Sequence, residues 1–167
     1  MRYSWTCRCC GKQQDELPTS WDSEAPFDWK AFSDADIKHL QDIEAEFFSV
    51  GGDHFIHGLI EIPIVGTTEA FSWGAWTSLS AQSVEIVRTV WKDSDRHTSG
   101  PFFGWLCTPL PYEPKTLHLK TMVHLRAPPT IPFIELEPTD HPLAVEQRNG
   151  ISMERVIAIA ETLMPRH

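Results

Sequence analysis

The stretch 54–79 constrains this chain most, because it reads as two long apolar strands joined by a short turn. In the first strand, Ile56, Ile60 and Ile62 share one face, since strand side chains alternate. In the second strand, aromatic residues alternate with small ones. Such side chains suit a half-buried sheet, and Gly66 supplies a turn. We therefore predict an antiparallel hairpin at the centre of the core.

The rest of the chain predicts four helices and three further strands from periodicity and capping residues. One helix begins at Ser33, includes Phe47 and Phe48, and ends at the glycine pair 51–52. Another is capped by Ser80 and buries Val84 and Val87. The remaining predicted helices span 142–147, with Asp140 as the cap, and 152–164; the predicted strands span 102–110, 116–126 and 133–137.

Strands gathered in the middle of the chain, with helices before, between and after them, predict an α+β fold. We expect a mainly antiparallel sheet with three to four helices packed on it. A length of 167 residues is sufficient for one domain with a substantial core. We expect residues 1–167 to form that domain, with 1–32 as an irregular segment, containing cysteine and tryptophan, that packs on the core.

Charge and hydropathy narrow the function classes. The chain has 23 acidic against 14 basic residues, a net charge of −9 that argues against binding nucleic acid. No apolar run approaches the length of a membrane helix, and the amino terminus has no signal-like apolar region. We therefore expect a soluble cytoplasmic protein whose four cysteines stay reduced. Its seven tryptophans fill the core or, as the alternative, form a protein-binding surface.

The cysteines near the amino terminus are the first candidate site. Cys7 and Cys10 have the C-x-x-C spacing with which two thiolates reach one zinc ion. A closed zinc site takes four ligands and the sequence has no second C-x-x-C, so Cys9, Cys107 or a histidine would complete it. The alternatives are a reduced turn without metal, which we favour, and a redox motif, for which the usual βαβ setting is missing.

A second candidate is a polar face on the two strands predicted over 116–137. A histidine such as His124 beside a carboxylate is able to act as a general acid or base. The alternative, which we favour, is a solvated sheet face whose opposite charges stabilise by about 0.2–1 kcal/mol per pair. The residues of this face are His118, Lys120, His124, Arg126, Glu135 and Glu137.

A third candidate is the pair Asp140 and His141, which lies just before a predicted helix. Adjacent residues rarely aim at one point, and Asp140 already has a role as the predicted cap. The chain contains no G-x-S-x-G, phosphate-binding glycine loop, H-E-x-x-H or dinucleotide motif. The lack of these motifs lowers the likelihood of the common enzyme classes and favours a protein that is not an enzyme.

Several segments together resemble a known family: CRCCGKQQDELP, FIHGLIEIPI, FSWGAWTSLS, PFFGWLC, LHLKTMVHLR and IELEPTDHPLAVEQRNGIS. In this order they are similar to the bacterial family catalogued as domain of unknown function 2199. Its amino-terminal pattern is C-x-x-C-G-x-x-H followed by Leu-Pro, and here Gln14 stands at the histidine position. The resemblance implies a soluble bacterial protein and brings no established activity.

Two functions from different classes follow. The first is a non-enzymatic binding protein whose acidic, aromatic surface meets a protein partner, for example an antitoxin-like or immunity protein that neutralises a basic toxin domain. The second is a small zinc-binding protein or metalloenzyme that uses Cys7 and Cys10, with Cys9 as a further ligand.

Overall fold

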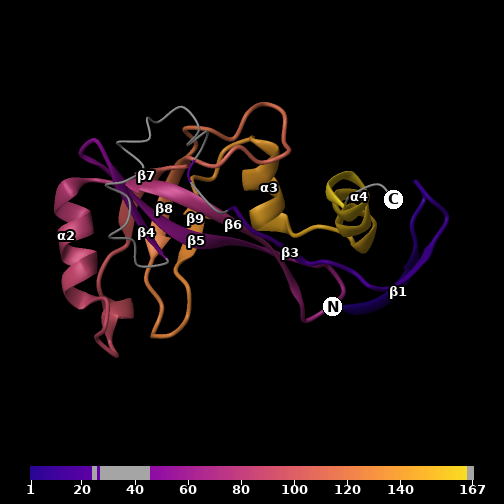
Figure 1. The fold of residues 1–167 in the computed structure, drawn as a ribbon, viewed down its shortest axis with the longest axis horizontal. Helices are drawn as coiled ribbons and strands as arrows, with labels where there is room; N and C mark the ends of the chain where they lie inside the picture. The colour runs from indigo at the N-terminus through magenta and orange to yellow at the C-terminus, as the bar shows by residue number, and fades with distance from the viewer. Residues whose placement is uncertain (24–25, 27–45, 165–167) are drawn as a thin grey trace.

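The structure, a computed structural model, describes residues 1–23, 26 and 46–164 (Figure 1). A curled sheet forms its centre, α2 lies at one end, and α4 lies at the other end beside the amino-terminal hairpin. In chain order the elements are β1 (Arg2–Thr6), β2 (Gln13–Glu16), β3 (Ser20–Trp21), β4 (Phe47–Val50), β5 (Asp53–Pro63), β6 (Ala70–Leu79), α2 (Ala81–Val90), the 3-10 helix η3 (Arg96–Thr98), β7 (Phe102–Trp105), β8 (Lys120–His124), β9 (Phe133–Leu136), α3 (Pro142–Asn149) and α4 (Met153–Leu163).

The central hairpin is formed by β5 and β6, as predicted. The two strands pair antiparallel over ten positions, from His54 opposite Leu79 to Pro63 opposite Ala70. Ile60 and Trp73, which face each other across this ladder, are buried in the largest hydrophobic cluster. Burial of such side chains at about 25 cal/mol per Å² makes this hairpin a main source of stability.

The main sheet is mixed, so the prediction of a mainly antiparallel sheet is wrong. Its strand order is β3-β6-β5-β9-β8-β7, with β4 beside β5. The pairs β3–β6 and β5–β9 are parallel, the latter through Leu59 opposite Phe133. The alternation of one strand shows which side chains share a face, but it does not specify the strand that will lie beside it. Long-range pairing of this kind is therefore set by packing of the whole fold.

The sheet curls so that the end of β7 returns to β6. Leu106 bridges to Thr77, and the Cys107 N–H donates to the Trp76 carbonyl oxygen at 2.8 Å. Gly104 makes this approach feasible, because a Cβ there would collide with the Ser78 carbonyl oxygen. The close contact of the two backbones thus depends on the missing side chain.

Phe47 and Phe48 lie in strand β4 and not in a helix, which corrects the prediction. They pair with Ile56 and Phe55 of β5, and both phenylalanines are buried. A strand covered on both faces has consecutive apolar residues, and a short run of this kind also fits helical spacing. The remainder of the predicted helix, from Ser33, lies outside the described residues.

Three α-helices occur within the described residues 46–164, and two of them have the predicted caps. The Ser80 hydroxyl accepts from the Ser83 N–H at 3.0 Å at the start of α2. The Ser152 hydroxyl accepts from the Arg155 N–H at 3.2 Å at the start of α4. Within the part of the chain that the structure describes, no helix is both long enough and apolar enough to cross a membrane.

The amino-terminal segment is more regular than predicted. Its described part forms the antiparallel β1–β2 hairpin and the short strand β3, which pairs with β6. Trp5, Cys7 and Leu17 are buried in the same hydrophobic cluster as Ile60 and Trp73. The hairpin therefore packs its apolar side chains on the central sheet.

The role of Gly104 leads to a stability prediction. Gly104→Ala forces β7 away from β6, so we expect the free energy of unfolding to fall by about 2–3 kcal/mol. Gly51→Ala is the matched control, because Gly51 has φ +57° but open space around its Cα. There only the left-handed backbone opposes alanine, at about 1 kcal/mol. Chemical denaturation measures the free energy of unfolding of both variants. An equal loss in the two would contradict the close backbone contact between β7 and β6.

Candidate functional site

The cysteines near the amino terminus lie in the turn that joins β1 to β2. Cys7 directly follows β1, and its N–H donates to the Lys12 carbonyl oxygen at 3.0 Å. The Gly11 N–H donates to the Cys7 carbonyl oxygen at 2.8 Å, and Gly11 has φ +70°. Glycine adopts this conformation at little cost. The turn is thereby closed tightly enough to bring its side chains together.

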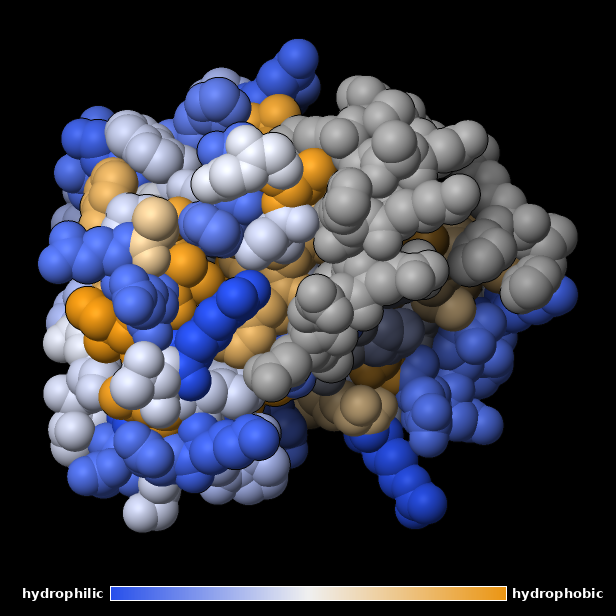
Figure 2. Space-filling view, turned by 60° about the vertical axis from the view of Figure 1, so that its left-hand side comes forward, coloured by the Kyte–Doolittle hydropathy of each residue, from blue (hydrophilic) through white to orange (hydrophobic). Residues whose placement is uncertain are grey.

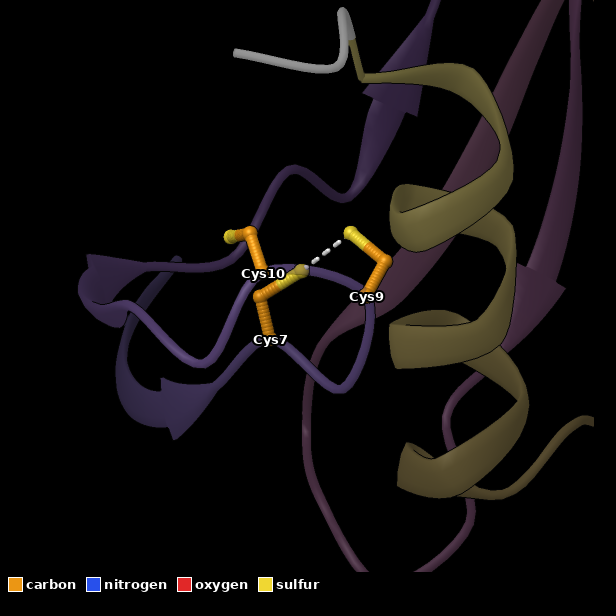
Figure 3. A group of neighbouring side chains, drawn as sticks. All are labelled: Cys7, Cys9 and Cys10. Atoms are coloured by element: carbon orange, nitrogen blue, oxygen red, sulfur yellow. Dashed lines mark hydrogen bonds between the residues drawn. The ribbon is translucent and has the colours of Figure 1, made fainter.

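Three thiols lie close together in this turn (Figure 3). The sulfur atoms of Cys7, Cys9 and Cys10 all lie within 4.8 Å of one another. The Cys7 and Cys9 sulfurs are 2.7 Å apart and share a hydrogen bond, while the Cys10 thiol points away from that pair. Cys7 is buried, whereas Cys9 and Cys10 are exposed. Among the described residues, this is the one group of three or more histidine, cysteine or acidic side chains placed to hold a metal ion.

Hydrogen bonding makes the three thiols unequal. The Cys9 thiol, together with the backbone N–H groups of Cys10 and Cys9, lowers the pKa of Cys7. The same hydrogen bond with Cys7 raises the pKa of Cys9 to about 11. Both shifts place the shared proton on Cys9, because a thiolate at Cys7 accepts these hydrogen bonds. Cys7 therefore ionises more readily than Cys9.

Helix α4 holds the cysteine turn in place. The Arg8 N–H donates to Glu161 Oε1 at 2.7 Å, and the Arg8 guanidinium lies 3.2 Å from Glu161 Oε2. The backbone hydrogen bond from Arg8 is the main cause that lowers the pKa of Glu161. This contact joins two residues that lie 153 positions apart in the chain. The turn is thus fixed at both the backbone and the side chain of Arg8.

Cys107, the other predicted ligand, lies in a different part of the fold. It is buried in a cluster with Phe48, Phe55 and Trp76, and its thiol donates to the Trp105 carbonyl oxygen at 3.1 Å. Burial raises the pKa of Cys107 to about 11. It therefore has the character of a core side chain and not of a metal ligand.

The polar residues predicted on the later strands lie mostly on the exposed side of β7, β8 and β9. Strand pairing places three of these polar residues in two rows together with apolar neighbours. One row contains Phe103, Met122 and Glu135, and the other contains Trp105, Lys120 and Glu137. We call this surface the outer face; it consists of Phe103, Trp105, Lys120, Met122, Glu135 and Glu137. Each row runs from an aromatic residue on β7 to a carboxylate on or just after β9.

The charged residues of this region form separate pairs. His124 Nε2 lies 2.7 Å from Glu135 Oε2, and Lys120 Nζ lies 3.8 Å from Glu137 Oε1. Arg126 points to another region, where its guanidinium lies 2.7 Å from Glu61 Oε1. Exposed pairs of this kind contribute roughly 0–1 kcal/mol each.

His118 lies near the Lys120–Glu137 pair, in the lining of the same hollow, and away from Arg126 and Glu61. It precedes β8 in an exposed position with φ 69°. The candidate polar cluster therefore does not converge on one point.

Two shallow hollows lie along the outer face. One of about 220 Å³ is lined by Phe103, Met122, Glu135 and Glu137, among others. The other, of about 180 Å³, is lined by Trp105, His118 and Glu137, among others. Hollows with apolar walls and charged rims provide room for side chains of a bound protein.

The exposed aromatic residues of β7 are the feature that the sequence analysis missed. Phe103, Trp105 and Met122 are 45%, 44% and 41% exposed, while Trp5, Trp73 and Trp76 are buried as the core interpretation predicts. The Phe103 and Trp105 rings meet edge to face with centroids 5.3 Å apart. The sequence did contain a signal for this exposure, because Phe103 and Trp105 alternate along β7 with the buried Phe102 and Gly104.

Exposed apolar residues also occur elsewhere on the protein. In Figure 2, which brings the α2 side of the molecule forward, apolar residues form separate patches among polar and charged ones. Ile86 of α2, at 42% exposed, is one such residue. Single exposed apolar residues are normal, so the distinguishing property of the outer face is that three lie together.

His141, and not Asp140, caps helix α3, which corrects the prediction. His141 Nδ1 accepts from the Leu143 N–H at 3.1 Å, and Nε2 lies 2.8 Å from the Pro114 carbonyl oxygen. The side chain is buried, whereas Asp140 is exposed. The sequence analysis chose Asp140 because aspartate is a common helix cap and histidine an uncommon one. The structure uses His141 because its second ring nitrogen also contacts the Pro114 carbonyl oxygen, which an aspartate has no N–H to do.

Comparison with known proteins identifies the family of this chain. One family model matches residues 6–151, from just before the cysteine turn to just after α3. The chain belongs to the family described as an uncharacterized protein conserved in bacteria (DUF2199). The family resemblance drawn from the sequence motifs is thereby confirmed. No curated protein and no solved structure matches the chain.

The assignment of the cap leads to a second stability prediction. His141→Ala removes the cap and leaves the Pro114 carbonyl oxygen without its partner, so we expect unfolding free energy to fall by about 1–3 kcal/mol. His141→Asn keeps a capping acceptor and should recover part of the loss. Asp140→Ala is the control and should cost below about 0.5 kcal/mol. A larger loss for Asp140→Ala than for His141→Ala in urea unfolding would restore Asp140 as the cap.

Proposed function

We propose that this protein is a non-enzymatic interaction domain that binds a protein partner through the outer face. The observation that supports this proposal most is the exposure of Phe103, Trp105 and Met122 together on one sheet surface. Aromatic residues and methionine are enriched at protein interfaces, and strands hold them rigidly at low cost in conformational entropy. The adjoining hollow of about 220 Å³ offers a place for an apolar side chain of the partner.

Charge indicates the kind of partner. Glu135 and Glu137 lie at the rim of the apolar rows, and the whole chain has a net charge of −9. A partner that presents an apolar anchor surrounded by lysine or arginine would complement this surface, and long-range attraction would speed the encounter. The concrete version of the proposal is an immunity or antitoxin-like protein that neutralises a basic toxin domain.

The chemistry of the outer face supports binding more than catalysis. His124 and Glu135 form a pair whose side chains are 37% and 54% exposed. A general base is effective when its surroundings hold it beside a substrate, which an exposed pair on the open surface of a sheet does not provide. The proposal places the protein in the cytoplasm, where its free thiols stay reduced.

The partner is identified from the outer face itself. A photoreactive amino acid at position 103, in cells of the native host, captures the bound protein, and the same group at position 86 is the control. The captured protein is then purified, and its affinity for the unmodified protein and for Phe103→Ala/Trp105→Ala is measured by calorimetry. We expect the double variant to bind at least about tenfold more weakly, since truncated interface aromatics cost about 2 kcal/mol or more.

Two matched variants make this experiment decisive. Ile86→Ala, which removes an exposed apolar residue from α2, should leave the affinity unchanged. Glu135→Gln/Glu137→Gln should slow association more than Glu85→Gln/Asp93→Asn, although both remove two charges. Equal capture from positions 86 and 103, or equal affinity for the double aromatic variant, would refute the proposal.

The cysteine turn favours a second candidate function, a metal-binding protein. Cys7 and Cys10 with Cys9 as a further ligand are the proposed residues, and zinc is the ion that their spacing suggests. A metalloenzyme is the catalytic version of this candidate. Elemental analysis of protein purified without added metal tests it, with near-stoichiometric metal as the supporting result.

A further inference from the structure

The three thiols of the cysteine turn form a ligand set of a particular kind. Every donor is sulfur, and all three come from one turn between β1 and β2. We propose that Cys7, Cys9 and Cys10 bind a soft monovalent metal ion, Cu(I), as three thiolates. This inference depends on the metal-binding candidate above and specifies its ion.

The described cluster supplies three sulfur ligands, a number that suits Cu(I). Structural zinc sites are almost always closed by four protein ligands. Within residues 1–23, 26 and 46–164, the cluster consists of three residues and offers no fourth histidine, cysteine or carboxylate. Glu161, the nearest carboxylate to the turn by its contacts, is already bound to Arg8. Soft thiolates select Cu(I), which is satisfied by three of them.

The geometry of the turn needs only a small adjustment. Three sulfur atoms bound to one ion at about 2.3 Å in a trigonal plane lie about 4.0 Å apart. The observed sulfurs lie within 4.8 Å, with the closest pair at 2.7 Å. The Cys10 thiol points away from the other two, so binding of one ion by all three requires the exposed Cys9 and Cys10 side chains to rotate (Figure 3).

The surroundings of the thiols favour an anionic metal–thiolate centre. Lys12, whose carbonyl oxygen accepts from the Cys7 N–H, adds a cationic residue to the same turn, whereas the charge of Arg8 is already paired with Glu161. The contact between Arg8 and Glu161 keeps the turn in its place on α4 as the ion binds.

The binding step is a ligand exchange without electron transfer. Each of the three thiols releases a proton to solvent, three Cu–S bonds form as the bonds from copper to the chelator or carrier that delivers it break, and copper remains Cu(I). Cys7 is a fixed ligand because it is buried in the core cluster, whereas Cys9 and Cys10 face solvent. Two exposed ligands allow a thiol of another molecule to add to the ion and remove it. The site therefore suits exchangeable copper and not a permanent structural ion.

The test uses the full chain, reduced and free of oxygen, titrated with Cu(I) in competition with a chromogenic Cu(I) chelator. We expect one copper per chain, with three sulfur neighbours in X-ray absorption spectra. Cys9→Ser and Cys10→Ser should each leave two sulfurs and lower the affinity at least about tenfold. Cys107→Ser is the control and should change neither value, because that thiol is buried in another cluster. Circular dichroism confirms that each variant is folded; Cys7 is left intact because it lies in the core.

A parallel titration with Zn(II) separates this inference from the candidate on which it depends. We expect zinc to be lost during desalting while copper is retained. Zinc held with four protein ligands, or copper held by two sulfurs in the unmodified protein, would overturn the Cu(I) inference and leave metal binding in place. Retention of neither ion would refute both.

Discussion

The close contact between β6 and β7 is the constraint on which the shape of this protein depends. β6 is paired with β5 along its whole length, and the segment after β7 joins its carboxyl-terminal half through Leu106 and Cys107. Since Gly104 has no side chain, the two backbones meet there. The curl that results buries Thr77 and Thr121, whose hydroxyls hydrogen-bond to each other at 2.6 Å. It also turns the opposite side of β7 and β8 outward, which gives the outer face its exposed aromatic residues.

The two candidate sites differ in the way that the fold produces them. The cysteine turn is local, because four consecutive residues supply every ligand and Gly11 closes the loop. The outer face is assembled from three strands, with Phe103, Met122 and Glu135 brought into one row by pairing between segments more than ten residues apart. A local site tolerates change in the sheet, while the outer face is sensitive to any shift in strand register.

The sequence predicted the parts of this fold that have a local physical cause. Ile56 and Ile60 alternate clearly, and Ser80 and Ser152 are favourable caps, so the central hairpin and the starts of α2 and α4 were correct. Phe47 and Phe48 were misplaced because a doubly buried strand has no alternation to distinguish it from a helix. The cap by His141 and the parallel pairing of Leu59 with Phe133 depend on partners far away in the chain. The same holds for the candidate sites: the spacing of Cys7 and Cys10 is visible in the sequence, whereas the exposure of Trp105 is not.

The contact between Arg8 and Glu161 has a consequence for how members of this family are compared. The family match ends at residue 151, but the helix that carries Glu161 spans Met153–Leu163. A fragment trimmed to the matched stretch would retain all three thiols and lose the helix that braces them. The carboxylate that anchors the cysteine turn is therefore supplied from beyond the stretch by which the chain is assigned to its family.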